Sequence, residues 1–187
     1  LSYYKTNQKE IPQMTGLVIP EAVFSKEAYH KEIFEPIKEA ITPHDTEKIL
    51  DHHFLNSRGA IARFDRNAIE IRLVDIQECP KADIAVCTLI IEVLKMLVSE
   101  DLATLQDQKK WQAQPLAQLL DAAIQSGENA SVSDLAYLGL FGLQAPATMQ
   151  EIWKHLYQKV KGKLHAQYHK PLEIILLEGT LSTRISK

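Results

Sequence analysis

Charged residues lie where the sequence predicts a pair of partly buried strands, between Ser57 and Pro80. Glu70 and Arg72 are two residues apart in the run AIEIRLVD, so their side chains point to one face of an extended chain, roughly 7 Å apart. A carboxylate beside Arg72 and the earlier Arg63 could hold an anionic ligand, such as a phosphate, together with a divalent cation. The alternative is an ordinary solvated strand face with a cross-strand Arg–Glu pair.

The same segment predicts a β-hairpin. Hydrophobic and polar residues alternate from Ala60 to Arg66, and Arg66-Asn67 is a candidate turn because asparagine tolerates positive φ. A two-residue turn there would place Arg63 directly opposite Glu70. The other face of the second strand is expected to be buried, and it carries Ile69, Ile71 and Leu73.

A long helix is predicted after the hairpin, from Pro80 to about Asp101, because proline is favoured in a first helical turn. Apolar residues recur there at helical spacing, and we expect them to be buried against the back of the sheet: Ile84, Cys87, Thr88, Ile91, Leu94 and Val98. Most of the remaining chain is predicted to be helical. Ser25 is expected to cap a helix running towards Ala40, and Thr148 with Glu151 forms a capping box.

The order of elements, strands early and helices later, predicts an α+β fold in which a small antiparallel sheet is covered by helices. We expect one domain over residues 1–187. The net charge of −3 predicts no nucleic-acid surface, and the absence of a long uncharged apolar run predicts no membrane span. Two cysteines without metal or redox spacing fit a reducing, cytoplasmic compartment.

The neighbouring histidines His52 and His53, beside Asp51, are a weaker candidate for a metal site. Adjacent residues of a helix point to different sides, so we do not expect both imidazoles to reach one ion. The later histidines and lysines are interpreted as solvated helix surface, namely His155, His165, His169, Lys159, Lys161 and Lys163.

The run from Arg58 to Asp75, centred on AIEIRLVD, resembles the core motif of the glutamate–cysteine ligase superfamily, and its type-2 carboxylate–amine ligase branch in particular. That motif is a strand in which Glu and Arg alternate with apolar residues, followed by Asp and a helix. The segment LEGTLSTRI, Leu177 to Ile185, is similar to the C-terminal part of the same branch.

The resemblance implies an ATP-dependent ligase that joins a carboxylate to an amine through an acyl-phosphate intermediate, as in glutathione biosynthesis. In this family the Glu of the motif binds Mg²⁺ and the Arg contacts the transferred phosphoryl group. Glu70 is therefore the implied metal ligand, and Arg72 the implied catalytic and ATP-binding residue. Arg63 is expected to be a second catalytic phosphate clamp, and Arg184 a further ATP-binding residue at the rim of the site. The implied ligands are ATP, Mg²⁺ and small amino-acid substrates, and a homo-oligomer is possible.

Family enzymes are longer than this chain, and their N-terminal half supplies further carboxylate ligands on an early strand. No such strand is predicted ahead of Ser57. We therefore expect the chain to be the C-terminal part of a longer ligase, inactive by itself, with a partial version of the cup-shaped glutamine-synthetase-like fold. The alternative is a non-catalytic interaction or assembly domain that retains this fold.

Overall fold

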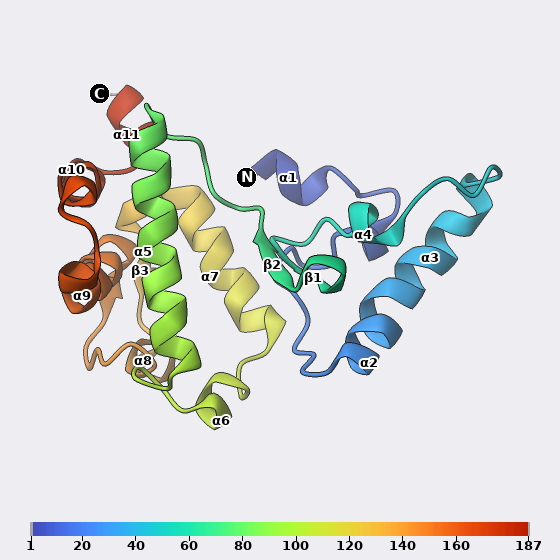
Figure 1. Cartoon of the computed structure of the whole chain (residues 1–187), viewed down its shortest axis with the longest axis horizontal. Coiled ribbons are helices and arrows are strands. Elements are labelled where there is room, and N and C mark those ends of the chain that lie inside the picture. The colour runs from blue at the N-terminus through green and yellow to red at the C-terminus, as the bar shows by residue number, and fades with distance from the viewer. Residues whose placement is uncertain (1, 187) are drawn as a thin grey trace. The chain divides into compact units, whose positions relative to one another are not determined.

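The computed structural model describes residues 2–186 and divides the chain into two compact units (Figure 1). The first unit contains Leu1–Val74 and Trp111–Gln118, and the second contains Asp75–Lys110 and Leu119–Lys187. Each unit combines helices with one two-stranded antiparallel sheet, so the predicted α+β class is confirmed. That the whole chain acts as a single domain stays a prediction. Over residues 2–186, no helix combines the length and the apolar character that crossing a membrane requires.

The long helical stretch of the first unit begins where its capping signal predicts. Ser25 accepts a hydrogen bond from the backbone N–H of Ala28 at 3.1 Å, which confirms it as an N-cap. The helical stretch then runs to residue 44, with one π-type turn inside it. The helical elements here are α1 (Ser2–Thr6), η1 (Pro12–Met14), α2 (Lys26–Tyr29), η2 (His30–Phe34), α3 (Glu35–Ile41), η3 (Thr42–His44) and α4 (His52–Leu55). Their shared core is Met14, Tyr29, Ile33, Phe34, Ile37 and Ile41.

The predicted hairpin is present as β1 (Ala60–Arg63) and β2 (Ala68–Ile71), but its register differs from the prediction. The connection is the 3-10 turn η4 (Phe64–Arg66) followed by Asn67 in the left-handed region at φ 48°. The four-residue connection pairs Arg63 with Ala68 and Ile61 with Glu70. The expectation that Arg63 lies directly opposite Glu70 is therefore wrong.

The buried face of the hairpin is the charged one. Ile61 and Arg63 of β1 are buried, and Glu70, the cross-strand partner of Ile61, shares that face. By contrast, Ile69 and Ile71 are 72% and 41% exposed, so their predicted burial is wrong. The inward charges are tolerated because they are paired with one another, as described below.

The second unit is mostly helical. Its sheet pairs β3 with β4 through Ser131↔Thr148 and Val132↔Ala147, and Thr148 with Glu151 forms the predicted capping box at the start of α9. The elements after β2 are α5 (Pro80–Val98), α6 (Leu105–Gln108), α7 (Ala113–Ser126), η5 (Gly127–Asn129), β3 (Ser131–Val132), α8 (Leu135–Gly139), β4 (Ala147–Thr148), α9 (Met149–Val160), η6 (Lys161–Lys163), η7 (Ala166–Tyr168), α10 (His169–Glu178) and α11 (Leu181–Ile185). The part of α7 up to Gln118 belongs to the first unit.

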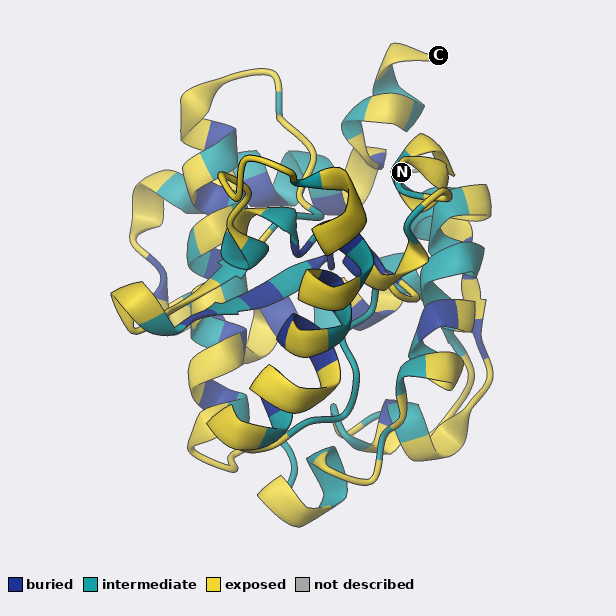
Figure 2. Ribbon diagram, turned by 90° about the vertical axis from the view of Figure 1, so that its right-hand side faces the viewer, coloured by how far each residue is buried: buried dark blue, intermediate teal, exposed yellow. Residues whose placement is uncertain are grey.

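Helix α5 begins at Pro80 as predicted (Figure 1), but it buries a different face. Figure 2 shows that the helices of the chain carry exposed residues beside buried and intermediate ones. The residues expected in the core are exposed or half exposed, with Ile91 at 48% and Val98 at 85%. The buried positions are Ala82, Ala85, Leu89, Val93 and Met96, which pack with α9 and α10. Helix α5 is apolar nearly all round, so periodicity alone does not choose a face. The two alanines let the partner helices approach closely.

Substitutions on the two faces of α5 test this register. Leu89→Ala is expected to lower the free energy of unfolding by about 2–5 kcal/mol, because it leaves a cavity in the core of the second unit. Ile91→Ala on the open face is expected to change it by no more than about 1 kcal/mol. Urea unfolding of both variants measures the difference, and equal losses would contradict the register.

Candidate functional site

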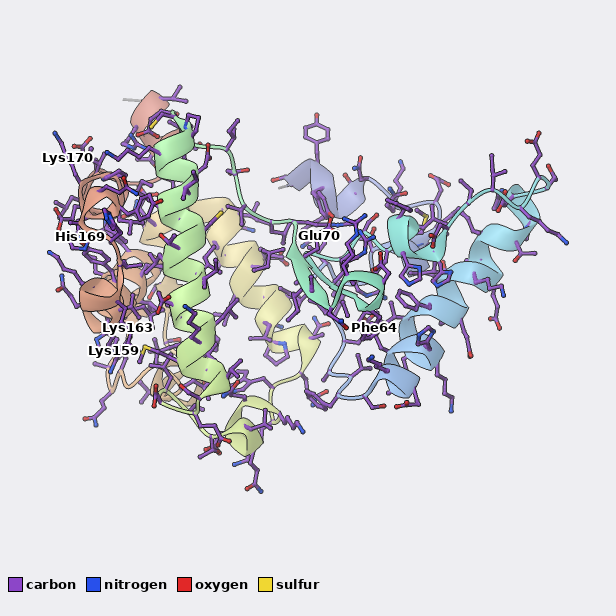
Figure 3. The ribbon with its side chains drawn as sticks, in the orientation of Figure 1. Phe64, Glu70, Lys159, Lys163, His169 and Lys170 are labelled. Atoms are coloured by element: carbon purple, nitrogen blue, oxygen red, sulfur yellow. The ribbon has the colours of Figure 1, made fainter. Side chains whose placement is uncertain are left out.

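The charged face of the hairpin, on which Glu70 is labelled in Figure 3, holds a set of ion pairs around Arg63, which is 5% exposed. Its Nε and Nη2 donate to the two carboxylate oxygens of Asp65 at 3.0 and 2.9 Å. Its Nη1 donates to Oε2 of Glu70 at 3.1 Å. The other oxygen of Glu70, Oε1, accepts from Nε of Arg72 at 2.9 Å. The structure thus brings together three of the predicted site residues.

Glu70 stands between the two guanidinium groups and remains accessible. Its side chain is 39% exposed, whereas those of Arg63 and Arg72 are 6% and 20% exposed. Each carboxylate oxygen has two lone pairs and accepts one hydrogen bond from an arginine here. One acceptor position on each oxygen is therefore left for a cation or a water molecule.

The arginines keep this carboxylate ionised. The hydrogen bond from Arg72, followed by that from Arg63, holds the pKa of Glu70 below its usual value. Hydrogen bonding to Arg63 lowers the pKa of Asp65 to about 2. The same pairing with Asp65, and then with Glu70, raises the pKa of Arg63. All three groups are consequently charged throughout the physiological pH range.

The depressed pKa of Asp65 predicts an acid-sensitive contribution to stability. A carboxylate whose pKa is lower in the folded state stabilises the fold above its unfolded pKa, here 3.8, and this contribution is lost as the pH falls towards about 2. Asp65→Asn is expected to reduce the loss of stability between pH 4 and pH 2. Urea unfolding midpoints across this range measure the effect, and parallel curves for parent and variant would contradict it.

A second arginine cluster lies directly before β1 and was not predicted as part of the site. Arg58 is 3% exposed, and its Nε and Nη2 donate to both carboxylate oxygens of Glu21 at 2.5 and 2.6 Å. Its Nη1 donates to Oδ1 of Asn56 at 3.1 Å and to the backbone oxygen of Gln13 at 3.3 Å. Arg58 is therefore held from three directions in the interior of the first unit.

Asn56 links the two arginine clusters. It is 0% exposed, and its side-chain oxygen accepts from Arg58, while its backbone oxygen accepts from Nη1 of Arg72 at 2.5 Å. Its Nδ2 donates to the hydroxyl of Tyr29 at 2.9 Å. That hydroxyl also accepts from the backbone N–H of Ala62 in β1 at 3.1 Å. The hydrogen-bond chain fixes the position of Arg72 relative to the buried arginine.

Leaving aside the exposed Arg66, which lies 3.4 Å from Asp65, the two clusters together are electrically balanced. The guanidinium groups of Arg58, Arg63 and Arg72 are matched by the carboxylates of Glu21, Asp65 and Glu70. An additional anion would therefore need a cation to enter with it, or a carboxylate to turn away. This balance favours a ligand such as a metal-bound phosphate over a free anion.

Arg184, the last predicted site residue, lies in the second unit. Its Nη1 and Nη2 donate to the two oxygens of Glu78 at 2.8 and 2.9 Å, and its Nε donates to the backbone oxygen of Gly179 at 3.2 Å. Gly179 has φ +102°, a conformation that favours glycine. The pair lowers the pKa of Glu78 to about 2. Arg184 thus fastens α11 to the segment before α5, and its role in binding ATP stays a prediction.

Comparison with known proteins finds one relative, whose name states no activity. An uncharacterized protein from Archaeoglobus fulgidus is 37% identical over 100 residues, which is 54% of this chain and 27% of the relative. The match thus spans about a quarter of that relative's length. No family model and no solved structure matches the chain. The resemblance to the carboxylate–amine ligases stays a prediction.

Proposed function

We propose that the charged hairpin face is part of the active site of an ATP-dependent carboxylate–amine ligase. Glu70 would hold Mg²⁺, and Arg72, assisted by Arg63, would hold the phosphoryl group being transferred. The observation that carries the proposal is the convergence of two arginines on the two oxygens of one accessible carboxylate. Phosphoryl transfer requires this kind of positioned positive charge more than it requires a protein nucleophile.

The ion pairs allow ligand binding by an exchange of partners. If the oxygens of Glu70 turned to hold Mg²⁺, Nη1 of Arg63 and Nε of Arg72 would be free to donate to a phosphate. Arg63 keeps its two hydrogen bonds to Asp65, so its guanidinium stays in place while Nη1 is offered to a phosphate oxygen. Arg72 is likewise retained by the backbone oxygen of Asn56. The site is thereby preorganised for an oxyanion.

In the proposed reaction, a carboxylate oxygen of the substrate attacks the γ-phosphorus of ATP, and the bond to ADP breaks. The amine then attacks the carbonyl carbon of the acyl phosphate, its nitrogen loses a proton to solvent, and inorganic phosphate leaves as the amide forms. The protein's contribution is to orient the γ-phosphoryl group and to balance the negative charge that spreads over its oxygens. Arg63 and Arg72 do this with donors that are held before the substrate arrives.

The further features of the resemblance belong to this proposal as well. The chain would form the C-terminal part of a cup-shaped ligase active in the cytoplasm on small amino-acid substrates, and another part of the protein would complete the metal site. Arg184 would reach ATP only after an exchange of its partner Glu78.

A second candidate function, non-catalytic assembly, is favoured by the open face of α5. Apolar side chains with spacings of three and four residues form a stripe there: Ile84, Cys87, Ile91, Leu94 and Val98. Such spacing is typical of helices that associate with another helix. A second copy of this chain is the occupant that this candidate function requires.

Product formation by the full-length gene product decides between the two functions. The ligase should release ADP and phosphate only when Mg²⁺, an amino-acid carboxylate and an amine are all present. Mass spectrometry should then find the amide. If calorimetry detects no binding of Mg-ATP by the full-length protein, the ligase proposal is refuted and the assembly role is favoured.

A further inference from the structure

Imidazole and carboxylate groups gather at the start of α4. Asp51 is the N-cap of this helix, and its Oδ1 accepts from the backbone N–H of His53 at 2.8 Å. The same oxygen lies 2.9 Å from Nδ1 of His53 and 3.8 Å from Nδ1 of His52. One carboxylate therefore lies within reach of both rings.

The two imidazoles lie side by side, contrary to the expectation that neighbouring residues point to different sides. Their ring centroids are 4.3 Å apart with an angle of 33° between the planes. One potential ligand atom from each of Asp51, His52 and His53 lies within 4.8 Å of the other two. The expectation is wrong because α4 is a single turn of four residues, and both rings pack against Phe34.

The ring of Phe34 packs against both imidazoles and restrains them. It is 3% exposed in the core of the first unit, and its ring centroid lies 4.6 Å from that of His52 and 4.8 Å from that of His53. His30 packs edge-on against the same phenyl ring at 5.0 Å. The buried ring of Phe34 thus holds the two imidazoles in place on one side, which reduces the conformational entropy that they lose when they bind a ligand.

The opposite side of the cluster is open to solvent. The side chains of Asp51, His52 and His53 are 48%, 33% and 23% exposed, so an ion can enter without unfolding of the helix. The hydrogen-bond geometry also orients His53. When Nε2 of His53 carries the proton, the lone pair of Nδ1 faces Oδ1 of Asp51, so the two atoms can share one metal ion.

We propose that Asp51, His52 and His53 bind one divalent transition-metal ion of the Zn²⁺ class, with water completing the coordination. Two imidazoles and a carboxylate suit Zn²⁺ and its neighbours, whereas Mg²⁺ prefers oxygen ligands only. Metal–ligand bonds of ~2.0–2.1 Å require small side-chain rotations to bring the ligand atoms closer than they are here. This site is separate from the Mg²⁺ position proposed at Glu70 and does not depend on the ligase reaction.

Metal titration of the tag-free, chelator-treated chain tests the proposal. Calorimetry with Zn²⁺ should detect one strong site per chain. Bound Co²⁺ should show the visible absorption band that is typical of four- or five-coordinate Co²⁺. Binding of Zn²⁺ should persist in millimolar Mg²⁺. Displacement of Zn²⁺ by Mg²⁺ at that concentration would show an all-oxygen site and overturn the proposal.

Substitutions locate the ion. His52→Ala and His53→Ala should each weaken Zn²⁺ binding by about tenfold or more. Asp51→Asn should also weaken it while preserving the helix, because asparagine is an equally good N-cap. His44→Ala, at an exposed histidine of the same unit, is the matched control and should leave the affinity unchanged. If Asp51→Asn and His53→Ala, both folded by circular dichroism, bind Zn²⁺ as the parent does, the proposal fails.

Discussion

Glu70→Gln is expected to lower the kcat of the full-length protein by about 10²–10³ while leaving its fold intact. Glutamine has nearly the same shape but lacks the charge that would bind Mg²⁺. The fold should be retained because Arg63 keeps its hydrogen bonds to Asp65, and Arg72 keeps its hydrogen bond to the backbone oxygen of Asn56. The loss of an accessible ion pair should cost only about 1 kcal/mol of stability.

Steady-state release of ADP measures this effect, and urea unfolding checks the stability. Glu39→Gln, at an exposed position of α3, is the matched control and should leave kcat unchanged. Arg72→Lys should also lower kcat, because an ammonium group cannot reproduce the planar fork of donors that holds Glu70 and Asn56. A Glu70→Gln enzyme with the parent's turnover would remove Glu70 from the reaction.

The hairpin shows how far periodicity predicts a site. The strand alternation correctly predicted that Glu70 and Arg72 share a face, because that property follows from the geometry of an extended chain. The register was wrong because the length of the turn was misjudged, although Asn67 does adopt the expected positive φ. Arg63 nevertheless reaches Glu70, since a long side chain spans the diagonal between neighbouring cross-strand pairs.

Other parts of the fold depend on contacts that a single sequence does not display. The exposed and buried faces of α5 are both apolar. Contacts with the partner helices determine that the face with Leu89 is the buried one. The side-by-side rings of His52 and His53 depend on Phe34, which belongs to a different helical segment. The local pattern of α5 correctly predicts a helix, and its tertiary partners decide which face is buried. The single turn of α4 is not predicted, because the sequence favours a short helix from Asp45 to Leu50 instead.

The pair formed by the buried Arg58 and the half-buried Glu21 has no signal in the local sequence. The two residues are 37 positions apart, and neither belongs to a regular strand or helix. The fold brings them together beside Gly16, where an added Cβ would lie 2.9 Å from a carboxylate oxygen of Glu21. A glycine with φ +54° is therefore needed for the close approach of the chain to this pair.

Arg58→Ala is expected to lower the free energy of unfolding by about 3–5 kcal/mol, the largest stability effect predicted for this chain. Truncation removes the hydrogen bonds to Glu21 and Gln13, and it leaves the buried side-chain oxygen of Asn56 without its strongest donor. Arg66→Ala is the matched control, because that arginine is 63% exposed and should contribute no more than about 1 kcal/mol.

Glu21→Gln separates the loss of charge from the loss of packing. It preserves volume but leaves the guanidinium of Arg58 buried without a counter-charge, so we expect it to destabilise the protein as well. Because both changes disrupt one interaction, the double variant should be clearly more stable than the sum of the two single losses predicts. Urea unfolding of the four proteins gives this coupling energy. Additive losses would mean that Arg58 is stabilised by its backbone and asparagine contacts, and that Glu21 contributes nothing through its charge.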